Sequence, residues 1–285
     1  WAEELAELLA ESGGGNRRLA VDHLDPLGLH ALQEHQVTVI DGEALMERAR
    51  LIKSEQEVTC LKLACAVAEL GMARMQEALV PGMTENALWS ILHQTNIELD
   101  GEWIETRLLS SGPRTNPWMQ ESSPRVIEAG DLVAFDTDMI GPNGYCADIS
   151  RTYLCGEGAG TPEQKALYAA AAEQLAHNFE QLRPGRTFRE AVEAEWVFPE
   201  RYLHYRYGFA HGVGLCDEFP FLPNLASIDK LSNPEDVIEP GMVFSIESYI
   251  GEVGGREGVK LEDQVLITET GPVYLSRYPL EERLL

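Results

Sequence analysis

The first fifty residues alternate between helical and extended patterns of apolar positions. Helical periodicity covers residues 3–11, and two short apolar-rich runs at 18–21 and 37–41 predict strands. Between the strands, a short helix is predicted to begin at Asp25, with proline in its first position. Because this segment is too small for a closed domain, we expect residues 1–50 to be the C-terminal remnant of an N-terminal α/β domain.

A long amphipathic helical pattern opens the rest of the chain. It begins at Ser54, where Glu57 completes a capping box, and it continues to about Leu79. We expect residues 51–285 to form one larger domain.

Two landmarks recur within this larger domain. Leu-Val-Pro-Gly-Met-Thr at 79–84 returns as Leu-Arg-Pro-Gly-Arg-Thr at 182–187, and Ile-Glu-Ala-Gly at 127–130 returns as Ile-Glu-Pro-Gly at 238–241. Pro-Gly-x-Thr alone is a common helix-to-helix turn, but two landmarks in the same order favour duplication. We therefore predict one unit used twice, each copy containing a helix, a Pro-Gly turn, a second helix and paired strands.

Charge restricts the classes of partner. The chain has 285 residues, with 22 Lys and Arg against 47 Asp and Glu, so its formal net charge is −25. A field of this sign repels nucleic acids and anionic lipid surfaces, so we expect neither as a partner. No apolar run approaches the roughly 18 residues of a membrane span.

Cysteine use and the first residue bear on cellular location. Five cysteines without a C-x-x-C pair favour reduced thiols and a cytoplasmic protein. The chain begins at Trp1, so we expect that the natural N-terminus is missing.

Acidic residues occupy equivalent places in the two copies. The residue six positions after the repeated glycine is Asp136 in the first copy and Glu247 in the second. A following strand in each copy, otherwise apolar, brings a further acid, Asp148 and Glu262 respectively. Burying four unpaired carboxylates costs several kcal/mol each, so a cation must neutralise them.

Divalent metal ions suit this role better than the nearby basic side chains, which are too few (Arg151, Arg256 and Lys260). His211 is the candidate nitrogen ligand, because glycines crowd it on both sides and permit close approach. A lone histidine is also common as a core residue, so this assignment depends on the acids around it. Four carboxylates and one imidazole favour two first-row ions over calcium or a structural zinc.

The order Asp, Asp, His, Glu, Glu over residues 50–275 resembles the dinuclear metallopeptidases of the methionine aminopeptidase, aminopeptidase P and prolidase superfamily. The resemblance implies an α/β fold, the duplicated pita-bread fold, with a curved and mainly antiparallel sheet covered by helices. It also implies a homodimer and two divalent ions, manganese, cobalt, iron or zinc.

The resemblance assigns roles to the five ligands. Asp136 would chelate one ion, His211 and Glu247 the other, and Asp148 and Glu262 would bridge them. A hydroxide held between the ions would attack a scissile carbonyl, with Glu247 as proton shuttle.

Four positions depart from the proline-specific members. Asp217 stands where these members carry a histidine after the metal histidine, and Trp118 lies near the place of a second histidine. The usual Asp-x-Gly is Asp-x-Asp, so Asp138 offers an extra metal ligand. Lys260 replaces the common arginine before the last glutamate. Together these departures resemble dimethylsulfoniopropionate lyases, which share the fold and perform a β-elimination.

Three functions therefore stay open. The first is a hydrolase of the Xaa-Pro dipeptidase or aminopeptidase P type, with a dipeptide substrate. The second is a lyase on a small zwitterion, with Asp217 as the base that removes the α-proton. The third is a catalytically silent binding module, although silent members of this fold usually lose ligands.

Substrate contacts are the least constrained part of the prediction. Lys260 and aromatic side chains that could hold a cationic substrate are the candidates. Of the aromatic residues near the ligands (Trp118, Tyr205, Tyr207, Phe209 and Phe219), Trp118 and Tyr207 are assigned to substrate binding together with Lys260.

Overall fold

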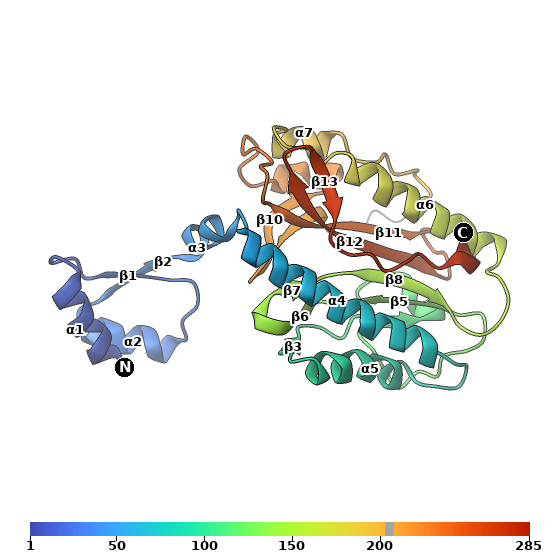
Figure 1. Ribbon diagram of the computed structural model, residues 1–285, viewed down its shortest axis with the longest axis horizontal. Coiled ribbons are helices and arrows are strands. Elements are labelled where there is room, and N and C mark those ends of the chain that lie inside the picture. The colour runs from blue at the N-terminus through green and yellow to red at the C-terminus, as the bar shows by residue number, and fades with distance from the viewer. Residues whose placement is uncertain (203–207) are drawn as a thin grey trace. The chain divides into compact units, whose positions relative to one another are not determined.

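The computed structural model describes residues 1–202 and 208–285 and divides the chain into two compact units. The N-terminal unit is Trp1–Arg50 and the main unit is Leu51–Leu285 (Figure 1).

The N-terminal unit is a small α/β arrangement with two parallel strands. As predicted, Asp25 caps its second helix and Pro26 is the first helical residue; Asp25 Oδ1 accepts a hydrogen bond of 2.8 Å from Gly28 N. Its buried apolar core is limited to four residues, Ala2, Ala6, Leu32 and Val37. Its elements are α1 (Ala2–Ser12), β1 (Arg18–Val21), α2 (Pro26–Glu34), β2 (Thr38–Asp41) and α3 (Glu43–Arg50).

Capping residues set where the helices of the main unit begin. Ser54 forms the predicted capping box with Glu57, and Thr161 and Thr187 cap the helices of the second copy in the same way. The helices are α4 (Glu55–Ala78), α5 (Glu85–Glu98), α6 (Pro162–Phe179) and α7 (Phe188–Glu193). Among the described helices, none combines the length and apolarity that crossing a bilayer requires.

The strands of the main unit pair antiparallel in three sheets. The largest has the order β10-β9-β11-β12-β13, and the others have the orders β4-β5-β8 and β3-β6-β7. The strands are β3 (Trp103–Ile104), β4 (Leu109–Ser111), β5 (Leu132–Asp136), β6 (Met139–Ile140), β7 (Cys146–Ala147), β8 (Ser150–Leu154), β9 (Gly208–Val213), β10 (Asp217–Pro223), β11 (Val243–Gly251), β12 (Gly258–Thr268) and β13 (Gly271–Tyr274). Short 3-10 turns complete the unit: η1 (Gly112–Thr115), η2 (Pro142–Gly144), η3 (Leu225–Lys230) and η4 (Glu282–Leu284).

A side-chain contact joins the sheet of the first copy to that of the second. Thr152 Oγ1 on β8 donates to Lys260 O on β12 at 2.9 Å and accepts from Lys260 N at 3.0 Å. Strands β8 and β12 therefore lie side by side (Figure 1), and the acids of both copies come to one place.

The predicted duplication is present in the backbone bonding. Thr84 bridges to Val126 in the first copy, and Thr187 makes the equivalent bridge to Val237 in the second. In both copies the backbone N–H of the glycine in the Pro-Gly turn donates a hydrogen bond of 2.9 Å to the carbonyl of the isoleucine that opens the second landmark. The turn glycines have φ of +99° and +85°, a conformation that favours glycine.

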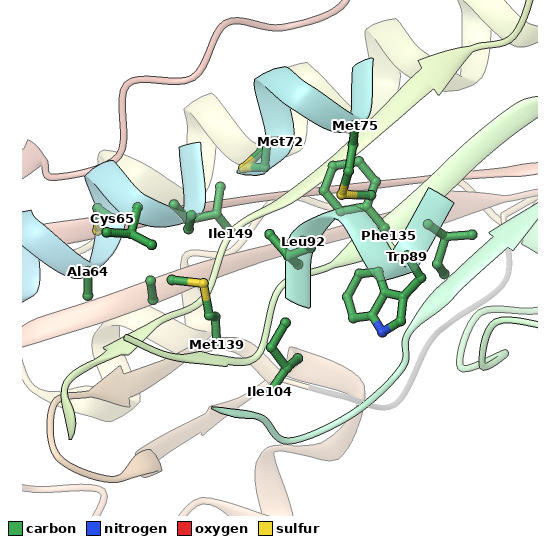
Figure 2. Packing of buried hydrophobic residues seen from close by; sticks show 14 of the residues in the cluster. Ala64, Cys65, Met72, Met75, Trp89, Leu92, Ile104, Phe135, Met139 and Ile149 are labelled. Atoms are coloured by element: carbon green, nitrogen blue, oxygen red, sulfur yellow. The ribbon is translucent and has the colours of Figure 1, made fainter. Parts of the chain in front are cut away.

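Helices cover the sheets and bury two apolar cores in the main unit. Met72 and Met75 of α4 and Trp89 and Leu92 of α5 pack with Phe135 of β5 (Figure 2). A second core lies between α6, α7 and strands β11 and β12. The mixed α/β class with mainly antiparallel sheets is confirmed.

Candidate metal centre

Strands from both copies carry the five predicted ligands into one buried cluster. The first copy supplies Asp136 at the end of β5 and Asp148 just before β8. The second copy supplies His211 from β9, Glu247 from β11 and Glu262 from β12. All five residues are at most 7% exposed.

The sequence predicted that Asp148 lies within a strand, and this was wrong. The strand breaks for two residues between β7 and β8. Thr137 Oγ1 causes the break, because it donates to Ala147 O at 2.7 Å and accepts from Ile149 N at 2.9 Å. The break turns the carboxylate of Asp148 toward the other ligands.

Strand register aligns the ligands of the second copy. Glu247 and Glu262 are direct cross-strand partners, and His211 is the partner of Ser245. Since Ser245 and Glu247 are two positions apart, they share one face of β11. Ser150 Oγ of the first copy donates to Glu262 Oε2 at 2.7 Å and ties this face to β8.

One nitrogen of the His211 ring faces three carboxylates. His211 Nε2 lies 3.3 Å from Asp148 Oδ2 and 3.5 Å from both Glu247 Oε1 and Glu262 Oε1. Ligand atoms of Asp148, His211 and Glu262 all lie within 4.8 Å of one another.

A second group of candidate ligands adjoins the first. Asp136, Asp138 and Asp148 also offer oxygens within 4.8 Å of one another, so Asp148 belongs to both groups. Asp138 takes a positive φ of +34° and accepts a hydrogen bond from Thr106 Oγ1. The predicted extra carboxylate is therefore near the other ligands.

Divalent ions fit the donors of this cluster. Asp136 Oδ1, Asp148 Oδ1 and Glu262 Oε1 are buried, and none has a hydrogen-bond partner among the described residues. Leaving one buried polar atom unsatisfied costs about 1–3 kcal/mol, and more when it is charged. Carboxylate and imidazole ligands suit manganese, iron, cobalt or zinc, which would satisfy these oxygens.

The pKa values reflect crowding of like charges. Burial raises the pKa of Asp148 well above its usual range, and Glu262 and Asp136 raise it further. Burial and the charge of Asp136 do the same to the pKa of Asp138. Burial lowers the pKa of His211, but its carboxylate partners outweigh burial, so the net pKa is well above its ordinary value.

Lys260 brings a positive charge into contact with the acidic cluster. Its Nζ lies 2.5 Å from Glu247 Oε2, 2.6 Å from Glu262 Oε2 and 3.2 Å from Asp136 Oδ2. Burial lowers its pKa, but these carboxylates raise it well above the ordinary value, so the side chain is an ammonium. Lys260 is 1% exposed, and its Nζ lies 5.9 Å from the centre of the Trp118 ring.

Asp217 contacts the other side of His211. It begins β10, and its Oδ1 lies 3.2 Å from His211 Nδ1, the ring nitrogen opposite the one that faces the remaining acids. A metal-ligating histidine commonly donates its second ring N–H to a carboxylate. Asp217 is therefore beside the candidate ligands but belongs to neither group of them.

The predicted substrate contacts have different outcomes. Trp118 lies at the site, stacked on Tyr249 with 6.2 Å between ring centres, but it is only 3% exposed. Phe209 is buried in the core beneath α6 and α7. Tyr207 and Tyr205 lie outside the described residues.

Several supporting residues were missed in the sequence. The missed supporting residues are hydroxyl side chains. Thr106 donates a hydrogen bond to Asp138, and Ser150 donates one to Glu262. Thr137 donates to the carbonyl of Ala147, next to the strand break at Asp148. Hydroxyl residues next to predicted ligands are the signal that could have found Thr137 and Ser150. Glu195, also missed, is 6% exposed and lines a cavity of about 20 Å³ that Glu247 also lines.

A duplicated α/β fold whose two halves together supply a carboxylate and imidazole cluster defines a metalloenzyme of the pita-bread class. The sequence profile of metallopeptidase family M24 matches residues 59–269. The chain belongs to this family, whose enzymes use divalent metal ions, and the predicted resemblance is confirmed.

Relatives within the family include lyases and dipeptidases. The chain is 44% identical, over its whole length, to the dimethylsulfoniopropionate lyase DddP of Roseovarius nubinhibens, and spans 65% of that protein. It is 32% identical to a probable dipeptidase, PepE, of Mycobacterium tuberculosis, over 83% of this chain and 61% of that protein. The solved structure of an Xaa-Pro dipeptidase from Bacillus anthracis superimposes with a TM-score of 0.82 at 27% identity, covering 98% of this chain and 77% of the other.

Proposed function

We propose that this chain is a divalent-metal lyase. It would act on a small zwitterion that carries a carboxylate and a β-sulfonium group, as the name of the dimethylsulfoniopropionate lyase relative describes. The observation that carries the proposal is Asp217, a carboxylate that contacts Nδ1 of His211, whereas the candidate ligand carboxylates of Asp148, Glu247 and Glu262 face the opposite ring nitrogen, Nε2.

The metal ions would be held by residues of both copies. Bound there, divalent ions supply positive charge that holds the substrate carboxylate and stabilises the charge that develops when its α-proton leaves. We propose two ions, of manganese, cobalt, iron or zinc. The residues that would hold them are Asp136, Asp138, Asp148, His211, Glu247 and Glu262.

Asp217 would act as the general base of the elimination. It takes the α-proton, the electron pair of that C–H bond forms the carbon–carbon double bond, and the C–S bond breaks to release the neutral sulfide. The products are dimethyl sulfide, acrylate and the proton now on Asp217. The contact with His211 Nδ1 would hold the carboxylate in a fixed orientation.

The electrostatics around Asp217 suit a cationic substrate. Partial burial and the charge of Asp217 raise the pKa of Glu105. The formal net charge of −25 adds to the negative field. A sulfonium ion is attracted to such a field, whereas a polyanion is repelled.

Replacing Asp217 tests the proposal. With saturating manganese, Asp217→Asn should lower kcat for release of dimethyl sulfide by about 10²–10⁴-fold, the usual contribution of a positioned general base. Metal content, measured on the same samples, should match the parent. Asp229→Asn, at an exposed position of η3, is the matched control and should change neither quantity.

Two results would overturn this assignment. If activity of Asp217→Asn falls only in proportion to its metal content, Asp217 orients His211 and is not the base. If the parent, fully loaded with manganese, releases no dimethyl sulfide, the lyase hypothesis itself fails.

A hydrolase of the Xaa-Pro dipeptidase type is the second candidate. The five candidate ligands, which the fold brings into one cluster, and the superposition on the Xaa-Pro dipeptidase favour it. In this reading Glu247 is the proton shuttle for hydrolysis of a dipeptide. Manganese- or cobalt-dependent release of proline from a panel of Xaa-Pro dipeptides, with no dimethyl sulfide, would establish it in place of the lyase.

Other expectations of the resemblance stay proposals. We propose a homodimer in the cytoplasm, to be tested by light scattering of the purified chain and by cell fractionation. A chain that remains metal-free after reconstitution would instead be the silent binding module.

A further inference from the structure

The ammonium of Lys260 contacts one oxygen of each of three carboxylates. These carboxylates come from three strands, β5, β11 and β12, and from both copies of the duplicated unit. The contacted atoms are Asp136 Oδ2, Glu247 Oε2 and Glu262 Oε2.

The second oxygen of each carboxylate is directed elsewhere. Glu247 Oε1 and Glu262 Oε1 lie 3.5 Å from His211 Nε2. Asp136 Oδ1 and Glu262 Oε1 are buried without a hydrogen-bond partner among the described residues. The oxygens left for a metal ion are therefore those that Lys260 does not contact.

Lys260 is itself held firmly. Its backbone N–H and carbonyl both bond to the hydroxyl of Thr152 on the neighbouring strand, at 3.0 and 2.9 Å. Its side chain is 1% exposed, with Nζ 5.9 Å from the Trp118 ring centre. A long side chain fixed at both ends can orient the groups that it touches, because little further entropy is lost.

We propose that Lys260 is a positioning residue that assembles Asp136, Glu247 and Glu262 for metal binding. Its ammonium lies behind the carboxylates, offsets their mutual repulsion in the metal-free chain, and turns one oxygen of each toward the ions. The proposal rests on the proposed metal centre but not on which reaction the centre performs. It also implies that the charge of Lys260 is used within the protein rather than on the substrate.

Metal binding without substrate tests this role. Titration calorimetry with manganese alone compares the full-length parent, Lys260→Met and Lys260→Arg. Residues that orient metal ligands typically contribute about 10–100-fold to affinity, so Lys260→Met should bind manganese that much more weakly. Lys260→Arg keeps the cation and should remain within about tenfold of the parent.

Thermal unfolding in EDTA provides a second readout. Lys260→Met should unfold at a lower temperature than the parent, because three carboxylates lose their shared cation. Lys230→Met, at an exposed position of η3, is the matched control and should leave both readouts unchanged.

The outcomes separate this proposal from the proposed function. Manganese binding by Lys260→Met that equals or exceeds that of the parent overturns it. If the parent binds no manganese, the metal centre fails, and unchanged stability of Lys260→Met in EDTA then overturns the positioning role as well. If Lys260→Met does not fold, Lys260→Arg decides, and a loss of affinity beyond tenfold counts against a role for the positive charge.

Discussion

Glu195 is a buried acid whose ionisation should destabilise the fold. It follows α7 and is 6% exposed, and its Oε1 accepts a hydrogen bond of 2.9 Å from Leu225 N. Its Oε2 is buried with no hydrogen-bond partner among the described residues. Burial raises the pKa of Glu195 from the ordinary 4.5 to about 7, although the bond from Leu225 lowers it.

The size of the effect follows from the pKa. The pKa of Glu195 is 4.5 in the unfolded chain and about 7 in the folded protein. The stability that the protonated carboxyl contributes is therefore fully present below pH 4.5 and is lost as the pH rises through about 7. Each pKa unit corresponds to about 1.36 kcal/mol, so at pH 8 the buried charge costs the folded protein about 3 kcal/mol. Glu195→Gln removes the charge and keeps an acceptor for Leu225. The variant should therefore gain about 3 kcal/mol over the parent at pH 8 relative to pH 4.

Unfolding of both proteins at two pH values measures this difference. For a unit of 235 residues, Leu51–Leu285, about 3 kcal/mol corresponds to a rise in Tm of roughly 6–12 °C. Thermal scans in EDTA at pH 5 and pH 8 should show most of the gain at pH 8. Glu269→Gln, at an exposed position, should show no gain at either pH. A Glu195→Gln variant whose advantage does not grow with pH would refute the reasoning, since Glu195 would then be ionised at little cost.

Two further changes have expected outcomes. Removing metal with EDTA should lower Tm more at pH 8 than at pH 5, measured by thermal scans. The aspartates of the candidate centre have raised pKa values, so the metal-free fold loses stability as the pH rises above their unfolded pKa of 3.8. Bound ions would neutralise the same charges and prevent this loss. Equal losses of Tm at both pH values would contradict this. Gly130→Ala and Gly241→Ala should each lower the free energy of unfolding by about 1–2 kcal/mol, because both glycines have positive φ, +87° and +92°. In denaturant titration, Gly241→Ala should lower the free energy of unfolding more than Gly130→Ala does. A Cβ at position 241 would lie 2.8 Å from Ile52 Cγ2, whereas a Cβ at position 130 would have nothing within 4 Å. Equal losses would show that Ile52 moves aside.

Local features made much of the fold predictable. The capping box at Ser54 and the paired Pro-Gly turns depend on residues a few positions apart, so the sequence contains them directly. The junction between β8 and β12 was not predictable in this way. It depends on hydrogen bonds between Thr152 and Lys260, which are 108 positions apart and follow no periodic pattern.

The site divides along the same line. Acids in otherwise apolar strands stand out, which is why Asp136, Glu247 and Glu262 could be predicted as a cluster. The break at Asp148 could not, because it depends on the side chain of Thr137 rather than on strand propensity. Lys260 could be identified as a nearby cation. Its contacts with Asp136, Glu247 and Glu262 could not be predicted, because they depend on the pairing register of the strands that carry them.

Duplication explains why the candidate centre draws its residues from both copies. The first copy supplies only the aspartates of the centre, and the second supplies His211, Glu247 and Glu262. Lys260 belongs to the second copy and reaches Asp136 of the first at 3.2 Å, so the counter-charge also crosses the junction. Neither copy alone could satisfy its buried carboxylates, because each lacks part of the ligands or the cation that offsets them. The buried acids of the candidate centre therefore require both copies to fold together.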